Sequence, residues 1–230
     1  MRINYLVLLF IISIYTVQGQ INPLVTKDTL VQRNWVETTY SQMSLDERLG
    51  QLFMVMVTSD QDRASTEKTK KLIKDHHIGG VIFSTGGPVR QAQLTNDLQK
   101  NSKVPLMIGM DAEWGLAMRL DSTYAFPWNM TLGAIKDNAI VEKVGNRIGK
   151  HAKRLGVHIN FAPDIDININ PQNPIIGNRS FGEDRENVAQ KGIAFMKGME
   201  SAGVLSSGKH FPGHGDTAVD SHKALPVIDF

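Results

Sequence analysis

The stretch GVLSSGKHFPGHGDTAVDSH, residues 203–222, begins with a short apolar run and continues as a loop rich in histidine and aspartate. Pro212, Gly213 and Gly215 disfavour helix, so the polar residues are expected in irregular structure. An apolar strand followed by a polar loop is the order in which α/β barrels present functional groups at the carboxyl ends of their parallel strands. The stretch therefore predicts a parallel β/α fold with a functional loop after one of its strands.

Within this loop, Asp220 and His222 are spaced two residues apart, which in extended backbone places both side chains on one face. A carboxylate that accepts one imidazole N–H fixes the tautomer of the ring and leaves the other nitrogen to transfer a proton. An isolated pair of this kind is more often an incidental surface pair. The functional interpretation therefore depends on the residues around it.

From Lys209 to His222 the loop resembles the signature K-H-F-P-G-H-G-x-x-x-x-D-S-H of family 3 glycoside hydrolases, in their β-N-acetylglucosaminidase (β-N-acetylhexosaminidase) branch. It matches that signature at every fixed position. The resemblance implies that His222 is the general acid/base and Asp220 its partner. It also implies that Lys209 and His210 bind sugar, with His214 in a supporting role.

Three further segments carry the same resemblance. Residues 110–115, M-D-A-E-W-G, resemble the family's D-x-E-G-G segment and imply a sugar-binding Asp111, with Trp114 where the family often has glycine. Residues 176–182, I-G-N-R-S-F-G, resemble I-G-x-R-S-F-G and imply a sugar-binding Arg179, and Arg119 fits the family's second sugar-contacting arginine. Residues 162–166 match A-P-x-x-D, which implies a supporting role for Asp166.

Two alternatives concern these arginines and carboxylates. Arg119 could simply pair with the nearby Asp121, and Arg179 with Glu183 or Asp184. Asp164 and Asp166 could also form a catalytic carboxylate pair, since alternation places them on one face. We favour sugar binding for Arg179 and a supporting role for Asp166, and we carry Arg119 as a sugar-binding candidate with its pairing to Asp121 as an equal alternative.

The rest of the chain alternates between helix and strand patterns, which indicates a parallel sheet with helical crossovers. Ser44 and Glu47 form the pattern of a capping box. The expected helices span 28–42, 44–51, 64–76, 88–100, 137–155 and 185–202, and the expected strands 52–57, 80–83, 104–110, 157–161 and 203–205. We expect the first five β/α units of a TIM-type (β/α)8 barrel. An open doubly wound sheet is the alternative, although its G-x-G-x-x-G turn is missing.

Length and composition agree with one exported globular domain. The chain has 230 residues, slightly fewer than the about 250 of a typical barrel. Its 25 Lys and Arg nearly balance 23 Asp and Glu, which gives no electrostatic case for nucleic acid, and without cysteine it forms no disulfides. Residues 1–19 have the pattern of a signal peptide, with a retained membrane anchor as the alternative, and residues 20–230 are expected to form the barrel domain.

The resemblance predicts a retaining glycoside hydrolase that removes terminal β-N-acetylglucosamine without a metal or other cofactor. The nucleophilic Asp is expected beyond residue 230, so we expect a barrel truncated on its C-terminal side that needs the rest of the domain and is inactive alone. The alternatives are a family 3 β-glucosidase, a non-catalytic sugar-binding protein, and a metal-dependent barrel hydrolase. Possible ligands for the last are His210, His214, Asp216, Asp220 and His222.

Overall fold

The computed structural model describes residues 28–227. Five parallel strands form one open sheet, in which every strand pairs with its neighbours in the chain. The strands are β1 (Met54–Val57), β2 (Gly80–Phe83), β3 (Met107–Met110), β4 (Ile159–Asn160) and β5 (Leu205–Ser206). A doubly wound sheet reverses its strand order at a switch point. The order β1-β2-β3-β4-β5 has no reversal, so the structure confirms five units of the barrel type and excludes the doubly wound alternative.

The helices occupy nearly the residues that the sequence predicts. They are α2 (Thr29–Ser41), α3 (Leu45–Gly50), α4 (Arg63–His76), α5 (Pro88–Lys100), α6 (Asn129–Gly133), α7 (Asn138–Arg154) and α8 (Arg185–Ser201), with the 3-10 turns η1 (Leu116–Met118) and η2 (Gly177–Arg179). The predicted capping box is present, because Ser44 Oγ accepts the N–H of Glu47 and Glu47 accepts the N–H of Ser44. The short elements α6, η1 and η2 were not predicted from the sequence.

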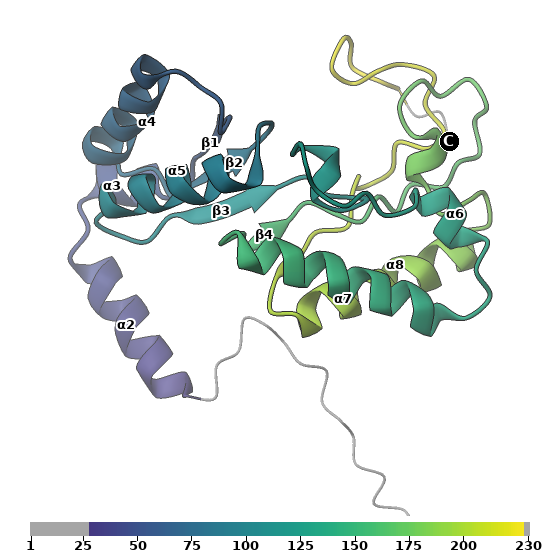
Figure 1. Ribbon diagram of the computed structural model, residues 1–230, viewed down its shortest axis with the longest axis horizontal. Helices are drawn as coiled ribbons and strands as arrows, with labels where there is room; N and C mark the ends of the chain where they lie inside the picture. The colour runs from purple at the N-terminus through teal and green to yellow at the C-terminus, as the bar shows by residue number, and fades with distance from the viewer. Residues whose placement is uncertain (1–27, 228–230) are drawn as a thin grey trace, which may run out of the picture.

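The core lies between the sheet and its helices (Figure 1). Val81, Phe83, Ile108 and Met110 of the central strands are fully buried. Helices α7 and α8 lie side by side in Figure 1, and they approach so closely that a Cβ on Gly198 would lie 2.0 Å from the backbone oxygen of Glu142. Small residues at this crossing therefore set the distance between the two helices.

The first strand departs from expectation. A continuous apolar run over residues 52–57 predicted a strand buried on both faces, but Leu52 and Met56 are 80% and 72% exposed. β1 is an edge of the described sheet, so no described strand lies along its outer side. That prediction is wrong for the residues described.

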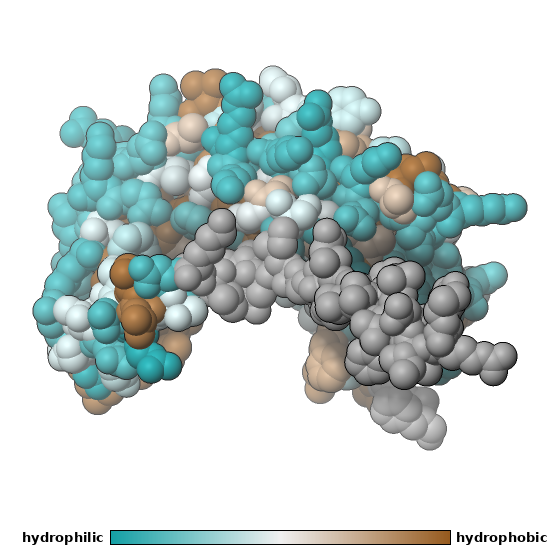
Figure 2. Space-filling view, turned by 90° about the horizontal axis from the view of Figure 1, so that it is seen from below, coloured by the Kyte–Doolittle hydropathy of each residue, from teal (hydrophilic) through white to brown (hydrophobic). Residues whose placement is uncertain are grey.

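Helix α2 carries the apolar residues that the sequence predicts, yet none of its residues is buried, and Figure 1 shows it extending away from the sheet. Trp35 and Tyr40 are both more than half exposed. Apolar groups also appear in Figure 2 at the end of the molecule that carries α2, α3 and α4. In the described part of the chain, no helix combines the length and the apolar character needed to span a membrane. The predicted signal peptide lies outside the described residues.

Candidate active site

The carboxyl ends of the strands form one straight edge of the sheet. Val57, Phe83, Met110, Asn160 and Ser206 are paired in a single row across all five strands. The segments that follow β3, β4 and β5 therefore leave the sheet side by side, and functional groups in β/α barrels gather at this edge.

Backbone contacts hold the segments after β4 and β5 together beyond the strands. Asp164 and Lys209 form an isolated parallel bridge, in which Lys209 N–H donates to Pro163 at 3.0 Å and Ile165 N–H donates to Lys209 at 2.6 Å. The segment after β3 is fixed differently. The buried side chain of Asn160 accepts the N–H of Ala112 at 2.8 Å and donates to its carbonyl at 3.2 Å. Asn160 thus positions the residues on either side of Ala112, which include Asp111 and Glu113.

Four of the predicted sugar-binding residues join one continuous network of ion pairs. Lys209 Nζ lies 2.7 Å from Asp111 Oδ1 and 2.8 Å from Glu113 Oε1. Arg119 Nη2 donates to Asp111 Oδ2 at 2.8 Å. Arg179 donates to Glu113 through Nε at 3.0 Å and through Nη2 at 2.8 Å. The network therefore links the segments after β3 and β5 with the turn η2.

The pairings that the sequence offered as alternatives for the arginines are wrong. Asp121 pairs with Arg90 at 2.9 Å and leaves Arg119 to Asp111. Asp184 caps α8 by accepting the N–H of Asn187 at 2.7 Å and leaves Arg179 to Glu113. Both arginines thus point toward the carboxyl edge of the sheet.

Glu113 was quoted in the motif but was given no role from sequence. Its side chain is fully buried, and it receives two donors from Arg179 and one from Lys209. Burial raises the pKa of this carboxyl, but the Arg179 and Lys209 charges outweigh burial and hold the pKa below its usual value. For Asp111, burial is likewise outweighed by Lys209 and Arg119, and its pKa is lowered. Both carboxylates are therefore ionised and act as hydrogen-bond acceptors at neutral pH.

The pKa of Asp164 is shifted in the opposite direction. This residue is fully buried, and burial together with the neighbouring charge of Asp166 raises its pKa to about 7. Its Oδ1 accepts the N–H of Asp166 at 2.9 Å, while Oδ2 lies 3.5 Å from Arg179 Nη2 and makes no hydrogen bond within the described residues. Asp164 and Asp166 thus differ in their environments, and Asp164 keeps its proton up to a pH of about 7.

Asp166 holds the start of the histidine loop. Its Oδ2 lies 2.6 Å from His210 Nδ1 and accepts the N–H of His210 at 3.2 Å, and its Oδ1 accepts the N–H of His214 at 2.6 Å. Burial raises its pKa, but the hydrogen bonds from His210 and His214 outweigh burial and lower it. The contacts are those of a residue that positions neighbouring groups, as proposed from sequence.

The loop is also tied to the segment after β4 by asparagines to which sequence reasoning assigned no role. Asn173 Nδ2 donates to the carbonyl of His214 at 2.6 Å, and Asn170 Nδ2 donates to the carbonyl of Asp216 at 2.9 Å. His214 itself is buried, with Nδ1 2.7 Å from Thr217 Oγ1. The only signal in the sequence is the asparagine-rich run 168–173, which matches no chemical motif.

A group of possible metal ligands differs from the set that the sequence suggested. Asp164, Asp166 and His210 place one ligand atom each within 4.8 Å of one another, and only His210 belongs to the suggested set. His210 Nδ1 and Asp166 Oδ2 contact each other at 2.6 Å, and Asp164 Oδ2 faces the Arg179 guanidinium. His210 and Asp166 already serve as partners for each other, and the guanidinium beside Asp164 disfavours a second cation there.

The predicted acid/base pair is formed, but it lies apart from the network. Asp220 Oδ1 lies 2.8 Å from His222 Nδ1 and accepts the His222 N–H at 2.9 Å. The hydrogen bonds from His222 lower the pKa of Asp220. The His222 side chain is 82% exposed, and within residues 28–227 neither side chain bonds to the ion-pair network. Because His222 uses Nδ1 for the carboxylate, its Nε2 is free to meet another molecule.

A cleft of about 240 Å³ is lined on its polar side by Asp166, His210 and Asp216. Its other walls are mostly apolar, from Ile165, Ile167, Ile169, residues 211–213 and Gly215, whereas Asp111, Arg119 and Lys209 do not line it. This volume is below the range of about 300–1,000 Å³ typical of pockets for drug-sized ligands, so it suits a single small ring.

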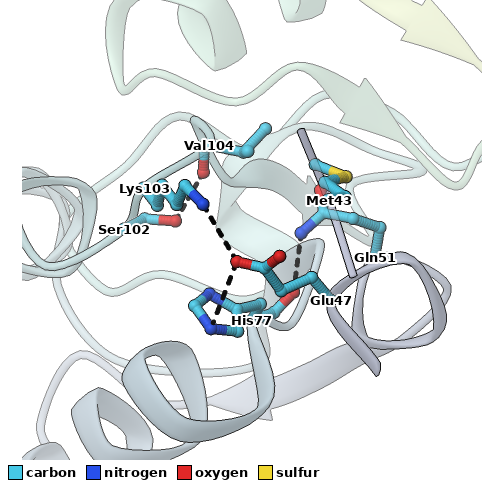
Figure 3. Close-up of a pocket in the computed structure, with 7 residues that line it drawn as sticks. All are labelled: Met43, Glu47, Gln51, His77, Ser102, Lys103 and Val104. Atoms are coloured by element: carbon cyan, nitrogen blue, oxygen red, sulfur yellow. Dashed lines mark hydrogen bonds and ion pairs between the residues drawn. The ribbon is translucent and has the colours of Figure 1, made fainter. Parts of the chain in front are cut away.

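A second, smaller pocket lies at the opposite edge of the sheet, between the ends of α3 and α4 and the turn before β3 (Figure 3). Glu47 points into it and contacts Lys103 at 3.0 Å and His77 at 3.7 Å. Its volume is about 10 Å³, which is roughly the room needed for one water. We assign it to stability and not to ligand binding.

Paired carboxylates and cations at the carboxyl edge of a parallel β/α sheet define this chain as a member of the β/α-barrel class, with a site suited to a polar, hydroxyl-rich ligand. Residues 44–230 match the model of the glycosyl hydrolase family 3 N-terminal domain, and the chain belongs to this family. This confirms the resemblance found in the sequence.

Relatives with known names agree with the assignment. The chain is 38% identical to β-hexosaminidase A of Pseudoalteromonas piscicida, over 96% of this chain and 38% of the relative. It is 39% identical to a solved family 3 β-N-acetylglucosaminidase from Paenibacillus, with a TM-score of 0.74 over 81% of this chain and 36% of that one. A β-glucoside phosphorylase is similar in fold, with 30% identity and a TM-score of 0.78 over 86% and 35% of the two chains. The chain thus spans little more than a third of the length of these proteins.

Proposed function

We propose that the protein containing this chain is a retaining glycosidase that removes terminal, non-reducing β-N-acetylglucosamine. Support comes from the family, from relatives named for this activity, and from the network at the carboxyl edge of the sheet. The observation that carries the proposal is the 2.8 Å contact between Asp220 Oδ1 and His222 Nδ1, since it fixes the tautomer that leaves Nε2 free for proton transfer.

In this mechanism Asp111, Arg119 and Lys209 bind the hydroxyls of the terminal ring. Their side chains are about a fifth exposed, at 23%, 28% and 17%, so a ligand can reach them. Asp111 offers acceptors, and the two cations offer donors. Arg179 and His210 complete the polar wall of the site.

The chemical step needs a proton donor and a nucleophile. His222 Nε2 protonates the glycosidic oxygen while a carboxylate attacks the anomeric carbon, so that the glycosidic bond breaks as the glycosyl–enzyme bond forms. His222 then takes a proton from water, which displaces the carboxylate and releases the sugar. Because His222 is exposed, the loop 207–227 must carry it to the bound substrate.

None of the carboxylates in the network is free to act as the nucleophile. Asp111 and Glu113 are held by cations, Asp166 is held by histidine N–H groups, and Asp164 is fully buried. We therefore assign the nucleophile to an Asp of the natural protein that follows residue 230, as the family resemblance implies. On this proposal the first 230 residues bind sugar weakly and do not turn it over.

The test is an assay of the natural protein that contains these residues with nitrophenyl β-N-acetylglucosaminide and nitrophenyl β-glucoside, with and without phosphate. We expect nitrophenol release from the first compound in the absence of phosphate, and a loss of about 10²- to 10⁴-fold in His222→Ala. A preference for the glucoside, a requirement for phosphate, or unchanged turnover in His222→Ala contradicts the proposal.

We also propose that the protein is exported, with peptidoglycan fragments, chitin oligosaccharides and glycoprotein glycans as candidate substrates. The basis is the signal-peptide pattern of residues 1–19. Amino-terminal sequencing of the mature protein should find Gln20 first. A mature protein that retains Met1 contradicts the export proposal.

A further inference from the structure

Two tryptophans stack on each other beside the ion-pair network. The ring centroids of Trp114 and Trp128 lie 4.0 Å apart, and their planes are tilted by 36°. Trp114 is partly buried, whereas Trp128 is 42% exposed. One indole therefore supports the other from below and leaves much of its surface to solvent.

Each tryptophan is the chain neighbour of a residue that belongs to the network or contacts it. Trp114 directly follows Glu113, the carboxylate held by Arg179 and Lys209. Trp128 directly precedes Asn129, a buried residue whose Nδ2 donates to the carbonyl of Arg179 at 2.7 Å. The pair is thus tied through its chain neighbours to Glu113 and to the backbone of Arg179.

The backbone around the pair is rigid. Phe126 N–H donates to the carbonyl of Trp114 at 2.9 Å, and Thr131 N–H donates to the carbonyl of Trp128 at 3.0 Å. Gly115 has a φ of +90°, and a Cβ at this position would lie 2.7 Å from the ring of Phe126. Because both indoles are held in place, a ligand that meets them pays little of the ordering cost that a mobile side chain imposes.

The outer tryptophan is more exposed than the charged side chains of the network. Lys209 and Arg179 are 17% and 18% exposed, whereas Trp128 is 42% exposed. The outer indole is therefore more accessible to a ligand than the charged groups of the network. Pyranose rings present a face of C–H groups with hydroxyls at the rim, and such a face stacks on an indole while polar neighbours contact the rim.

We infer that Trp128, supported by Trp114, is a stacking platform for the sugar ring joined to the terminal residue of the substrate. The inference rests on the proposed function and adds a second binding subsite to it. The occupant is a neutral pyranose, such as the second N-acetylglucosamine of a chitin-type disaccharide. Trp114 contributes by holding the outer indole at a fixed angle.

The experiment measures the affinity of the natural protein for N-acetylglucosamine and for the sulfur-linked, non-hydrolysable analogue of N,N′-diacetylchitobiose, by calorimetry. Trp128→Ala should lower the affinity for the disaccharide by about 2- to 12-fold, the loss that corresponds to one aromatic contact. The affinity for the monosaccharide should not change. Trp128→Phe should restore most of the affinity. Trp35→Ala, on the exposed helix α2, is the matched control and should change neither ligand.

The outcomes separate this inference from the proposed function. The inference alone is overturned if the wild-type protein binds the disaccharide no more tightly than the monosaccharide. It is also overturned if Trp128→Ala lowers the affinity for both ligands equally, or for neither. Wild-type protein that binds neither acetamido sugar overturns the proposed function, and the inference with it. A urea titration of Trp128→Ala confirms that the variant is folded before its affinity is compared.

Discussion

Arg179 donates two hydrogen bonds to Glu113, from Nε to Oε2 at 3.0 Å and from Nη2 to Oε1 at 2.8 Å. The two residues are 66 positions apart in the chain. Lys209 adds a third donor to Oε1 at 2.8 Å. The fully buried carboxylate of Glu113 therefore joins the segments that follow β3, β4 and β5. Buried charges of this kind are costly unless every partner is present.

The first prediction concerns this carboxylate. Glu113→Ala leaves the charges of Arg179 and Lys209 without their shared partner in a buried site, so the free energy of unfolding should fall by about 3–5 kcal/mol. Urea denaturation at neutral pH measures it. Asp121→Asn is the matched control, because its ion pair with Arg90 is half exposed, and such pairs contribute at most about 1 kcal/mol. Equal losses in the two variants contradict the assignment of Glu113 as the central partner.

Most of the fold follows from patterns local in sequence. The helices α4 and α5 begin and end within one residue of their predicted limits, because apolar periodicity, capping residues and Pro88 all act over a few residues. The placement of Asp111 and Lys209 at one edge follows as well, since each comes within three residues of the end of a strand of a parallel sheet.

The pairings within the site were beyond sequence reasoning. Glu113 and Arg179 are 66 residues apart, and the chain between them contains turns that no periodicity predicts. In the sequence, Asn160 is indistinguishable from an ordinary strand residue. Its role depends on Ala112, which lies 48 positions away in the chain. The exposed face of β1 was missed for the same reason, because burial depends on which strands lie alongside.

The second prediction concerns the acid/base pair. Asp220→Asn removes the negative charge that stabilises the protonated imidazole of His222, so turnover by the natural protein should fall by about 10²-fold or more. The matched control is Ser221→Ala, which changes the residue between them without touching the contact and should keep nearly wild-type turnover. Steady-state kinetics on a nitrophenyl glycoside measure both. Full turnover in Asp220→Asn means that the carboxylate plays no part in proton transfer.

The third prediction concerns Glu47 in the small pocket. The hydrogen bond from the Ser44 N–H and the contact with Lys103 lower its pKa from 4.5 to about 2. A lowered carboxyl pKa adds stability that is complete above pH 4.5 and is lost as the pH falls through about 2. Glu47→Gln should therefore lose less stability than wild type over this range in urea denaturation at several pH values. Parallel curves for the two proteins rule out the contribution.

The fourth prediction concerns Asp164, whose carboxyl pKa is shifted in the opposite direction to that of Glu47. Its pKa is raised from 3.8 to about 7, so the folded protein holds a proton that the unfolded chain has released, and stability falls as the pH rises through this interval. Above about pH 7 the loss is complete, and below pH 3.8 it is absent.

Asp164→Asn keeps an acceptor for the N–H of Asp166 and removes the ionisation, and Arg179 retains Glu113 as its main partner. The variant should therefore be more stable than wild type at pH 8 and equal to it at pH 3.5, as measured by urea denaturation at both values. Asp166→Asn is the matched control. Its pKa is lowered by His210 and His214, so loss of its charge should destabilise the protein at pH 8. If Asp164→Asn is no more stable than wild type at pH 8, the carboxyl carries no burial penalty and the charge balance described for the site is incorrect.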